Sequence, residues 1–278
     1  MSERREGETL ARRDVTGPWE TLLVEIRDTS LVIQLNRPER LNALSPTMLA
    51  ELSELWPLYD ADTRVRVAIV TGAGDRAFCS GADVGTVSDV SRNRTSDYVR
   101  ENAFTPVQAR IRKPTICAVN GICASAGLHF IADCDFSIAA EAATFLDTHT
   151  TVGQVSALEP IGLARRIPLG AVMRMVLLGR HERLRAQRAY ELGLVTEVVP
   201  DDALLERALE LAANIARNSP TAIEISRQAI LDSYNHPLDV ALALGFVRIR
   251  AHADHHPDAQ EGPKAFFEKR EPQWERST

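Results

Sequence analysis

Three short apolar runs, each typical of a buried strand, punctuate the middle of this chain and limit what it can fold into. They are residues 65–71 (VRVAIVT), 116–119 and 135–139, and the first two end in turns that contain glycine. Segments with helical spacing separate and follow these runs. Strands that alternate with helices indicate an α/β architecture. The sequence therefore predicts an α/β core.

Two earlier runs, 22–26 and 31–35, are separated by the turn-forming residues 28–30, which predicts a β-hairpin. Ser45 followed by Pro46 then predicts the start of a helix. A serine caps free backbone N–H groups, and proline fits the first helical position because it has no N–H to satisfy. The first third of the chain is thus predicted to form a hairpin followed by a capped helix.

The last quarter of the chain changes to a helical pattern. Apolar residues recur at helical spacing in 204–212, 223–230 and 240–249. The first residues are instead polar and heavily charged, as in a flexible tail. We therefore expect three parts: a tail at 1–17, an α/β core at 18–202 and a helical C-terminal region at 203–278.

Composition narrows the class of protein. With 278 residues, 45% of them hydrophobic and 25% charged, the chain can build an ordinary core. A net charge of -6 gives no support to nucleic-acid or anionic-membrane partners. Polar residues interrupt the most apolar stretch, 115–143, so it predicts a buried core rather than a membrane span. The four cysteines lack zinc-like pairs and the N-terminus lacks a signal peptide, so we expect a cytoplasmic protein with reduced thiols.

Four motifs carry the chemistry: 36–44 (NRPERLNAL), 77–84 (AFCSGADV), 118–129 (AVNGICASAGLH) and 265–270 (AFFEKR). Each alone is a commonplace turn or helix end, but in this order and spacing they resemble the crotonase (enoyl-CoA hydratase/isomerase) family over residues 20–272. The resemblance implies a spiral core of ββα turns with a helical C-terminal trimerisation region. It also implies a homo-oligomer, either a trimer or a dimer of trimers.

Reactions at a CoA thioester place negative charge on the thioester oxygen, and two backbone N–H groups aimed at that oxygen stabilise it. Small residues at 81–83 and 126–127 would let the substrate approach the backbone closely. The resemblance implies that the two donors are the N–H groups of Ala82 and Ala126. It also implies contacts with CoA at Arg40, Leu41, Ala82 and Asp83. Two further contacts, from Phe266 and Lys269, would come from a neighbouring subunit.

The chain departs from the family pattern at two positions, because His129 and His149 stand where hydratases of this family carry glutamates. Histidine transfers protons near neutral pH, but two imidazoles do not orient a water molecule as two carboxylates do. If the two histidines face the thioester across a small gap, we expect them to titrate as a coupled pair. The acid limb of activity would then lie somewhat below the ordinary histidine pKa of about 6.5.

The sequence leaves the roles of three further residues near these histidines undecided. Glu159 lies in the loop where isomerases and dehalogenases of this family place a carboxylate, although in a different register. Asp147 is expected either to orient His149 or to act as a cap. A triad of Ser125, His129 and Asp147 lacks the context of a nucleophile elbow and is disfavoured.

The predicted function is an enzyme that acts on an acyl-CoA or enoyl-CoA thioester by hydration, double-bond isomerisation or a related enolate reaction. A thioester or β-keto carbon–carbon hydrolase and a catalytically silent CoA-thioester binder are the alternatives. CoA would enter as part of the substrate, and no metal or nicotinamide cofactor is expected. A histidine-rich segment, 252–256, is interpreted as a solvated face. Residues 87–104 are expected to line the acyl pocket.

Overall fold

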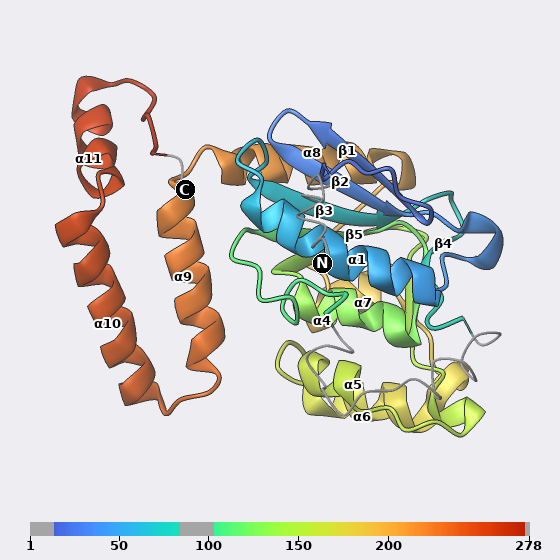
Figure 1. Ribbon diagram of the computed structural model, residues 1–278. Coiled ribbons are helices and arrows are strands. Elements are labelled where there is room, and N and C mark those ends of the chain that lie inside the picture. The colour runs from blue at the N-terminus through green and yellow to red at the C-terminus, as the bar shows by residue number, and fades with distance from the viewer. Residues whose placement is uncertain (1–13, 84–102, 276–278) are drawn as a thin grey trace, which may run out of the picture.

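The computed structural model describes residues 14–83 and 103–275 and has a layered α/β core with a separate helical arm (Figure 1). Within these residues, the larger sheet has six strands in the order β1-β2-β3-β5-β7-β10. The first strand is antiparallel to the second, and all other neighbours are parallel. The strands are β1 (Leu22–Arg27), β2 (Ser30–Leu35), β3 (Val67–Gly72), β5 (Thr115–Val119), β7 (Phe136–Ala140) and β10 (Glu197–Val199).

A smaller sheet of four described strands lies beside the larger one, in the order β4-β6-β8-β9. The chain passes from β3 to β4, from β5 to β6 and from β7 to β8, so each pair spans both sheets. Helices follow the second and third pairs, which produces the expected spiral of ββα turns. The strands are β4 (Ala77–Cys79), β6 (Ile122–Ala124), β8 (Thr144–Leu146) and β9 (Leu184–Arg185).

Local sequence signals account for the first elements. β1 and β2 form the predicted hairpin, in which Arg27 pairs with Ser30 across a tight turn. Helix α1 (Pro46–Ala61) begins as expected, because the Ser45 side chain accepts a hydrogen bond from Met48 N at 3.2 Å. The remaining helices around the core are η1 (Pro38–Arg40), η3 (Ser125–Gly127), α4 (Leu128–Asp133), η4 (Thr150–Val152), α5 (Leu158–Leu163), α6 (Leu169–Leu178), η5 (Gly179–His181), α7 (Ala186–Leu192) and η6 (Asp201–Ala203).

Helices cover both faces of the larger sheet. On one face, α1 buries its apolar stripe, including Leu52, Leu55 and Trp56. On the other face, α8 (Leu204–Ala216) packs with Leu204 and Ala208 against the strands. The helical region expected from residue 203 therefore begins with a helix that belongs to the core.

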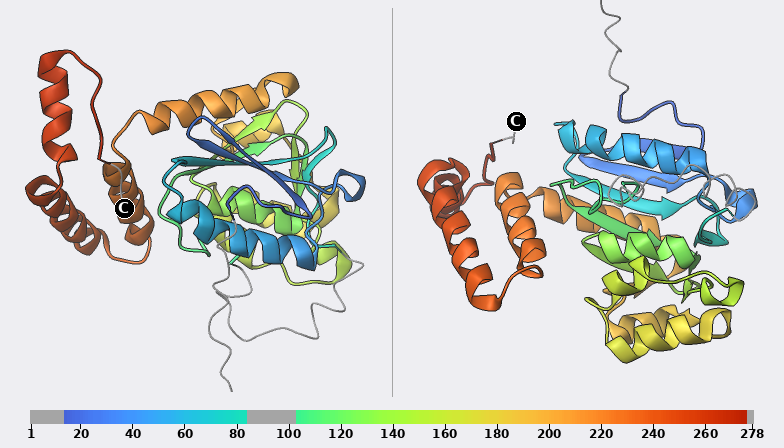
Figure 2. Two further views of the ribbon diagram at one scale, coloured as in Figure 1. Left: turned by 45° about the horizontal axis from the view of Figure 1, so that its top comes forward. Right: turned by 60° about the horizontal axis from the view of Figure 1, so that its bottom comes forward.

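The helical arm begins at α9 and stands beside the core in all three views (Figures 1 and 2). It consists of α9 (Pro220–Ser233), α10 (Leu238–His255) and α11 (Asp258–Glu268). Arg227 is the only buried residue of α9, and its Nε lies 2.6 Å from Asp135 Oδ1 at the start of β7. None of the α10 residues is buried. Many apolar side chains of the arm are therefore exposed in the single chain.

Two expectations fall at the edges of the described residues. The tail expected at 1–17 is packed from Asp14 onward. Val15 is 2% exposed, and Arg64 Nη2 lies 2.8 Å from Asp14 Oδ2. Residues 1–13 lie outside the described ranges, as does most of the segment expected to line the acyl pocket, 87–104. In the described ranges, no helix is long and apolar enough to cross a membrane.

Candidate active site

The first part of the site is the turn that follows β4. Leu44 N donates to Gly81 O at 2.8 Å, and Asp83 N donates to Leu44 O at 3.0 Å. In a parallel bridge of this kind the residue between them, Ala82, directs its own N–H away from the partner strand. Gly81 has φ +103°, a conformation that favours glycine. The Ala82 N–H is therefore available on the opposite side.

The turn that opens α4 lies against this one. A side-chain carbon at Gly81 would fall 3.0 Å from Ser125 Cβ and 3.5 Å from Ala126 N, so the two backbone segments touch. The Ser125 hydroxyl is already engaged, because it bonds Thr148 Oγ1 at 2.5 Å and accepts from Thr148 N at 3.1 Å. The structure thus uses Ser125 to tie η3 to the segment after β8, and the Ser125 triad is not formed.

The segment after β8 carries His149. Asp147 Oδ1 accepts hydrogen bonds from His149 N at 2.9 Å and pairs with His149 Nδ1 at 2.7 Å. The other oxygen of Asp147 accepts from Ser156 Oγ. Asp147 is 1% exposed, so this carboxylate is a buried anchor. It both caps the turn and orients the imidazole, which combines the two roles expected of it.

Glu159 completes the cluster and approaches both histidines. Its Oε1 lies 3.4 Å from His129 Nε2 and 3.8 Å from His149 Nε2. Glu159 and His129 are only 5% and 6% exposed. Both distances exceed that of an ordinary hydrogen bond, so the carboxylate oxygen remains free to accept a proton from a third group. The structure therefore brings together the three side chains that the sequence singled out.

Close packing of α5 on α4 sets this contact. A side-chain carbon at Gly162 would lie 2.8 Å from Ala132 Cβ, so the helices touch at these two small residues. Glu159 precedes Gly162 by three residues, and His129 precedes Ala132 by three. Residues three apart share a helix face. The helix contact at one turn thus places the carboxylate beside the imidazole at the next.

Carboxylates control the charge of His149. The hydrogen bond to Asp147 raises the pKa of His149; burial opposes this effect, and attraction to Glu159 adds to it. Burial alone would raise the pKa of Asp147, but hydrogen bonds from His149 and Ser156 outweigh it and lower that pKa. The pKa of His149 is thus raised, because the hydrogen bond to Asp147 and the attraction of the two carboxylates outweigh the effect of burial.

Sequence reasoning missed one acid near the cluster. Asp133 lies one helical turn after His129 on α4 and accepts a hydrogen bond from Thr105 Oγ1 at 2.5 Å. Burial raises the pKa of Asp133. The neighbouring Phe104 ring packs edge-on against the His129 ring at 5.4 Å. The four-residue spacing from His129 was the signal that could have identified Asp133.

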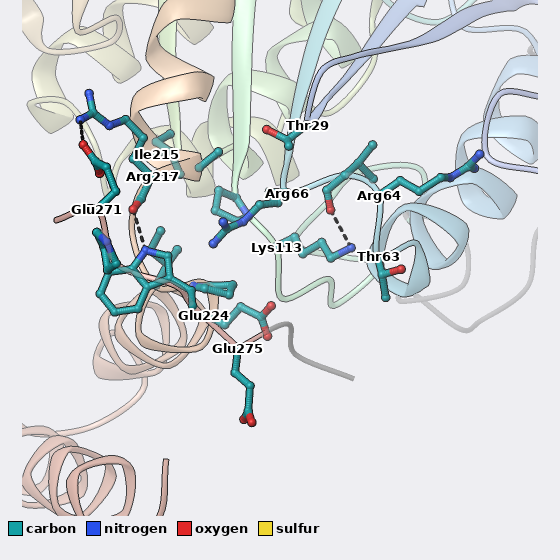
Figure 3. Close-up of a pocket in the computed structure, with 17 residues that line it drawn as sticks. Thr29, Thr63, Arg64, Arg66, Lys113, Ile215, Arg217, Glu224, Glu271 and Glu275 are labelled. Atoms are coloured by element: carbon teal, nitrogen blue, oxygen red, sulfur yellow. Dashed lines mark hydrogen bonds and ion pairs between the residues drawn. The ribbon is translucent and has the colours of Figure 1, made fainter. Parts of the chain in front are cut away.

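A large cavity, about 1120 Å³, continues from the cluster. His129, Leu158 and Ile161 line it on the core side, and Ile230 and Tyr234 of α9 line the other side. A second hollow of about 380 Å³ lies near the C-terminal end of the chain (Figure 3). It is lined by Lys113, Glu224 and Trp274 among others and includes none of the expected site residues.

The residues expected to contact CoA fall into two groups. Those of the NRP and GAD motifs are adjacent, because Ser80 N donates to Leu41 O at 3.1 Å and Arg37 Nη2 lies 2.9 Å from Asp83 Oδ2. Arg40 is exposed at the end of η1.

Phe266 and Lys269 instead lie at the end of α11, on the helical arm (Figure 1). Phe266 is 80% exposed. Within a single chain this second group is separated from the cluster.

The histidine-rich segment at the end of α10 is separate from the cluster. The His252 and His256 rings stack with centroids 5.0 Å apart. Within the described ranges, no group of three or more His, Cys, Asp or Glu is arranged to hold a metal ion.

Strand pairs that pass between two sheets, with the turn after β4 set against the turn before α4, place this chain in the crotonase superfamily. The chain belongs to the enoyl-CoA hydratase/isomerase family, whose model matches residues 25–277.

Relatives include hydratases and an isomerase. The chain is 32% identical over 250 residues to the (E)-benzylidenesuccinyl-CoA hydratase of Thauera aromatica, covering 90% of this chain and 96% of that protein. It is 32% identical over 266 residues to the 1,2-epoxyphenylacetyl-CoA isomerase of Escherichia coli, covering 92% and 98%. The crystal structure of an enoyl-CoA hydratase/isomerase from Mycobacterium paratuberculosis is 42% identical with a TM-score of 0.87, covering 93% of this chain and 100% of that one. The chain is therefore an enzyme of the enoyl-CoA hydratase/isomerase kind.

Proposed function

We propose that this enzyme moves protons at an enoyl-CoA thioester with Glu159 as the general base, and that its reaction is a double-bond shift. The observation that carries the proposal is the position of Glu159 Oε1 near Nε2 of both His129 and His149, at 3.4 and 3.8 Å. One carboxylate at the centre of the cluster suits a reaction in which a single group removes and returns a proton.

The proposed step is balanced without any further reactant. The Glu159 carboxylate removes a proton from the carbon next to the thioester of a 3-enoyl-CoA, and the electron pair moves onto the thioester oxygen to give an enolate conjugated with the double bond. The N–H groups of Ala82 and Ala126 donate to that oxygen. The new carboxylic acid then returns the proton at the far end of the conjugated system. A bond to hydrogen is broken at one carbon and formed at another, and nothing is oxidised or reduced.

The two histidines support the carboxylate in this proposal. His149, whose pKa the Asp147 hydrogen bond raises, favours the cationic form and so places a positive charge near the Glu159 carboxylate. His129 provides a second imidazole near Glu159 and lines the large cavity. Hydration shares the same enolate, but it requires a well-oriented water molecule, and among the described residues only Glu159 pairs with both imidazoles. The geometry therefore favours isomerisation over hydration.

A hydrolase is the second candidate, and one observation favours it. The pairing of Asp147 with His149 at 2.7 Å is the arrangement in which a carboxylate orients a histidine base. Such a base activates water for attack on the thioester carbon, and the CoA thiolate leaves. Free CoA would then be the diagnostic product.

A screen of enoyl-CoA thioesters by mass spectrometry and NMR separates these possibilities. Isomerisation leaves the mass unchanged and moves the double bond, whereas hydration adds one water. Hydrolysis releases free CoA. Tight binding without any product would support the catalytically silent binder and overturn the proposal.

CoA is proposed to enter only as part of the substrate, with no metal or nicotinamide requirement. The NRP and GAD segments, at Arg40, Leu41, Ala82 and Asp83, are proposed to hold its adenine end, and Phe266 and Lys269 to approach it from a neighbouring copy. Treatment with a chelator should leave turnover intact. Loss of turnover that zinc restores would contradict this.

The four cysteines are free and buried, which suits a reducing compartment. We therefore propose that the enzyme is cytoplasmic.

A further inference from the structure

The cavity beside His129 carries an unusual number of arginines. It has a volume of about 1120 Å³, lies between α4, α5 and α9, and has His129 in its wall. A pocket for a plain hydrocarbon chain would be lined mostly by apolar side chains. This cavity also has four guanidinium groups in its lining, on Arg110, Arg165, Arg166 and Arg227.

Two of the three aspartates in the lining are already neutralised. Asp135 Oδ1 pairs with Arg227 Nε at 2.6 Å. Asp232 Oδ2 pairs with Arg248 Nη2 at 2.5 Å. Neither carboxylate is therefore left to balance the charge of the remaining arginines.

The third aspartate, Asp133, bonds Thr105, and its burial favours the neutral acid. Arg110, Arg165 and Arg166 make no ion pair with any carboxylate in the described ranges. The cavity wall therefore has an excess of positive charge, and an anion is the partner that such a wall lacks.

Two of the guanidinium groups are held ready for a ligand. Arg166 donates from Nε to Ala132 O at 2.9 Å and from Nη1 to Asp135 O at 3.2 Å, and its Nη2 bonds Cys134 O. These bonds fix the guanidinium at the end of α4 and leave two of its five N–H donors. Arg227 is 8% exposed, and its Nη2 is buried without a hydrogen-bond partner among the described residues. A buried donor without a partner costs free energy that an anionic ligand can recover.

The third group, Arg165, also lines the cavity. Its guanidinium stacks over the Tyr234 ring of α9 at 5.3 Å and is otherwise exposed. Ala132, where Arg166 is anchored, follows His129 by three residues, or about 4.5 Å along the helix axis. The positive end of the cavity is therefore within reach of a short acyl chain whose thioester lies beside His129.

From this charge pattern, which rests on the thioester chemistry proposed above, we infer that the substrate is a dicarboxylic acyl-CoA. Its free carboxylate pairs with Arg165 and Arg166 at the far end of the cavity, while its thioester lies beside Glu159. A bidentate carboxylate–guanidinium pair supplies both affinity and orientation.

Calorimetric binding of two saturated thioesters, adipyl-CoA and hexanoyl-CoA, tests this inference without relying on turnover. They have the same number of carbons and differ by the terminal carboxylate. Adipyl-CoA should bind about tenfold more tightly or better. Arg165→Gln should remove most of that difference and leave the hexanoyl-CoA affinity unchanged. Arg183→Gln, which changes an exposed arginine outside the cavity, should alter neither affinity.

Equal affinities for the two thioesters in the wild-type protein would overturn the inference. So would an Arg165→Gln variant that weakens both equally, because Arg165 would then serve the CoA phosphates. If adipyl-CoA is preferred but no enoyl-CoA is turned over, the tail recognition stands and the proposed proton transfer fails.

Discussion

His129 and Glu159 meet across two helices, with Nε2 of the histidine 3.4 Å from Oε1 of the carboxylate. The contact exists because α5 packs on α4 at Gly162 and Ala132, one turn away. His149 approaches the same oxygen from the segment after β8, held by Asp147. A single carboxylate thus lies near both imidazoles.

Replacing either histidine should impair turnover strongly. His149→Ala and His129→Ala are each expected to lower kcat on the order of a hundredfold or more, because each removes an imidazole that supports the Glu159 carboxylate in proton transfer. CoA affinity should change little, because the proposed oxyanion donors are backbone groups. His181→Ala, at an exposed position outside the cluster, is the matched control. Near-normal turnover in both variants would reduce these histidines to packing residues.

The pH dependence should reveal the hydrogen bond between Asp147 and His149. Because the pKa of His149 is raised, its cationic form persists above the ordinary value of about 6.5 and is lost as pH rises through the raised pKa. If that form supports Glu159, the alkaline limb of the kcat profile lies above about 6.5.

Asp147→Asn should move the alkaline limb to lower pH, whereas Asp202→Asn at an exposed site should leave it in place. NMR titration of the His149 ring provides the same comparison independently of turnover. An alkaline limb that stays in place in Asp147→Asn would contradict the assignment.

The spacing of α4 and α5 is testable with two small residues. Gly162→Ala places a methyl group 2.8 Å from Ala132 Cβ, and such overpacking typically costs about 1–3 kcal/mol of stability. Turnover should fall as Glu159 moves away from His129. Adding Ala132→Gly should restore turnover, although that glycine costs about 1 kcal/mol of helix stability.

Gly170→Ala on α6, where no atom lies within 4 Å of the new carbon, is the control and should be neutral or slightly stabilising. Thermal unfolding and turnover are measured together. A double variant no more active than Gly162→Ala would exclude this contact as the device that positions Glu159.

The apolar face of α10 predicts self-association. Leu242, Phe246 and Ile249 recur at helical spacing and are 65%, 63% and 65% exposed. Exposed apolar patches of this kind mark protein interfaces. We expect a trimer or a dimer of trimers by light scattering, and Phe246→Asp should dissociate it. Ala251→Asp, on the opposite side of α10, should not. A wild-type monomer at micromolar concentration would contradict the assembly.

The hairpin, the buried strands and the capped start of α1 were predictable because their signals are local. The turn at 28–30 and the Ser45–Pro46 pair act on residues close in sequence. The packing of Val15 was not predictable, because one apolar residue among polar neighbours gives no pattern that indicates burial.

The candidate site was predictable in its members but not in its arrangement. The family resemblance identified His129, His149 and Glu159 as candidates. Their convergence depends on the packing of α5 on α4, a tertiary contact without a local signal. The charge of His149 likewise depends on Asp147 and Glu159 together, and the sequence alone could not say which of them would reach the ring.

Exchange of the proton next to the thioester tests the central claim most directly. A saturated acyl-CoA is incubated with the enzyme in deuterated water, and NMR follows deuterium entering the carbon beside the thioester. The wild-type enzyme should catalyse this exchange, and Glu159→Gln should slow it on the order of a hundredfold or more, whereas Glu141→Gln at an exposed site should not. Exchange at the wild-type rate in Glu159→Gln, or release of free CoA without exchange, would contradict Glu159 as the base.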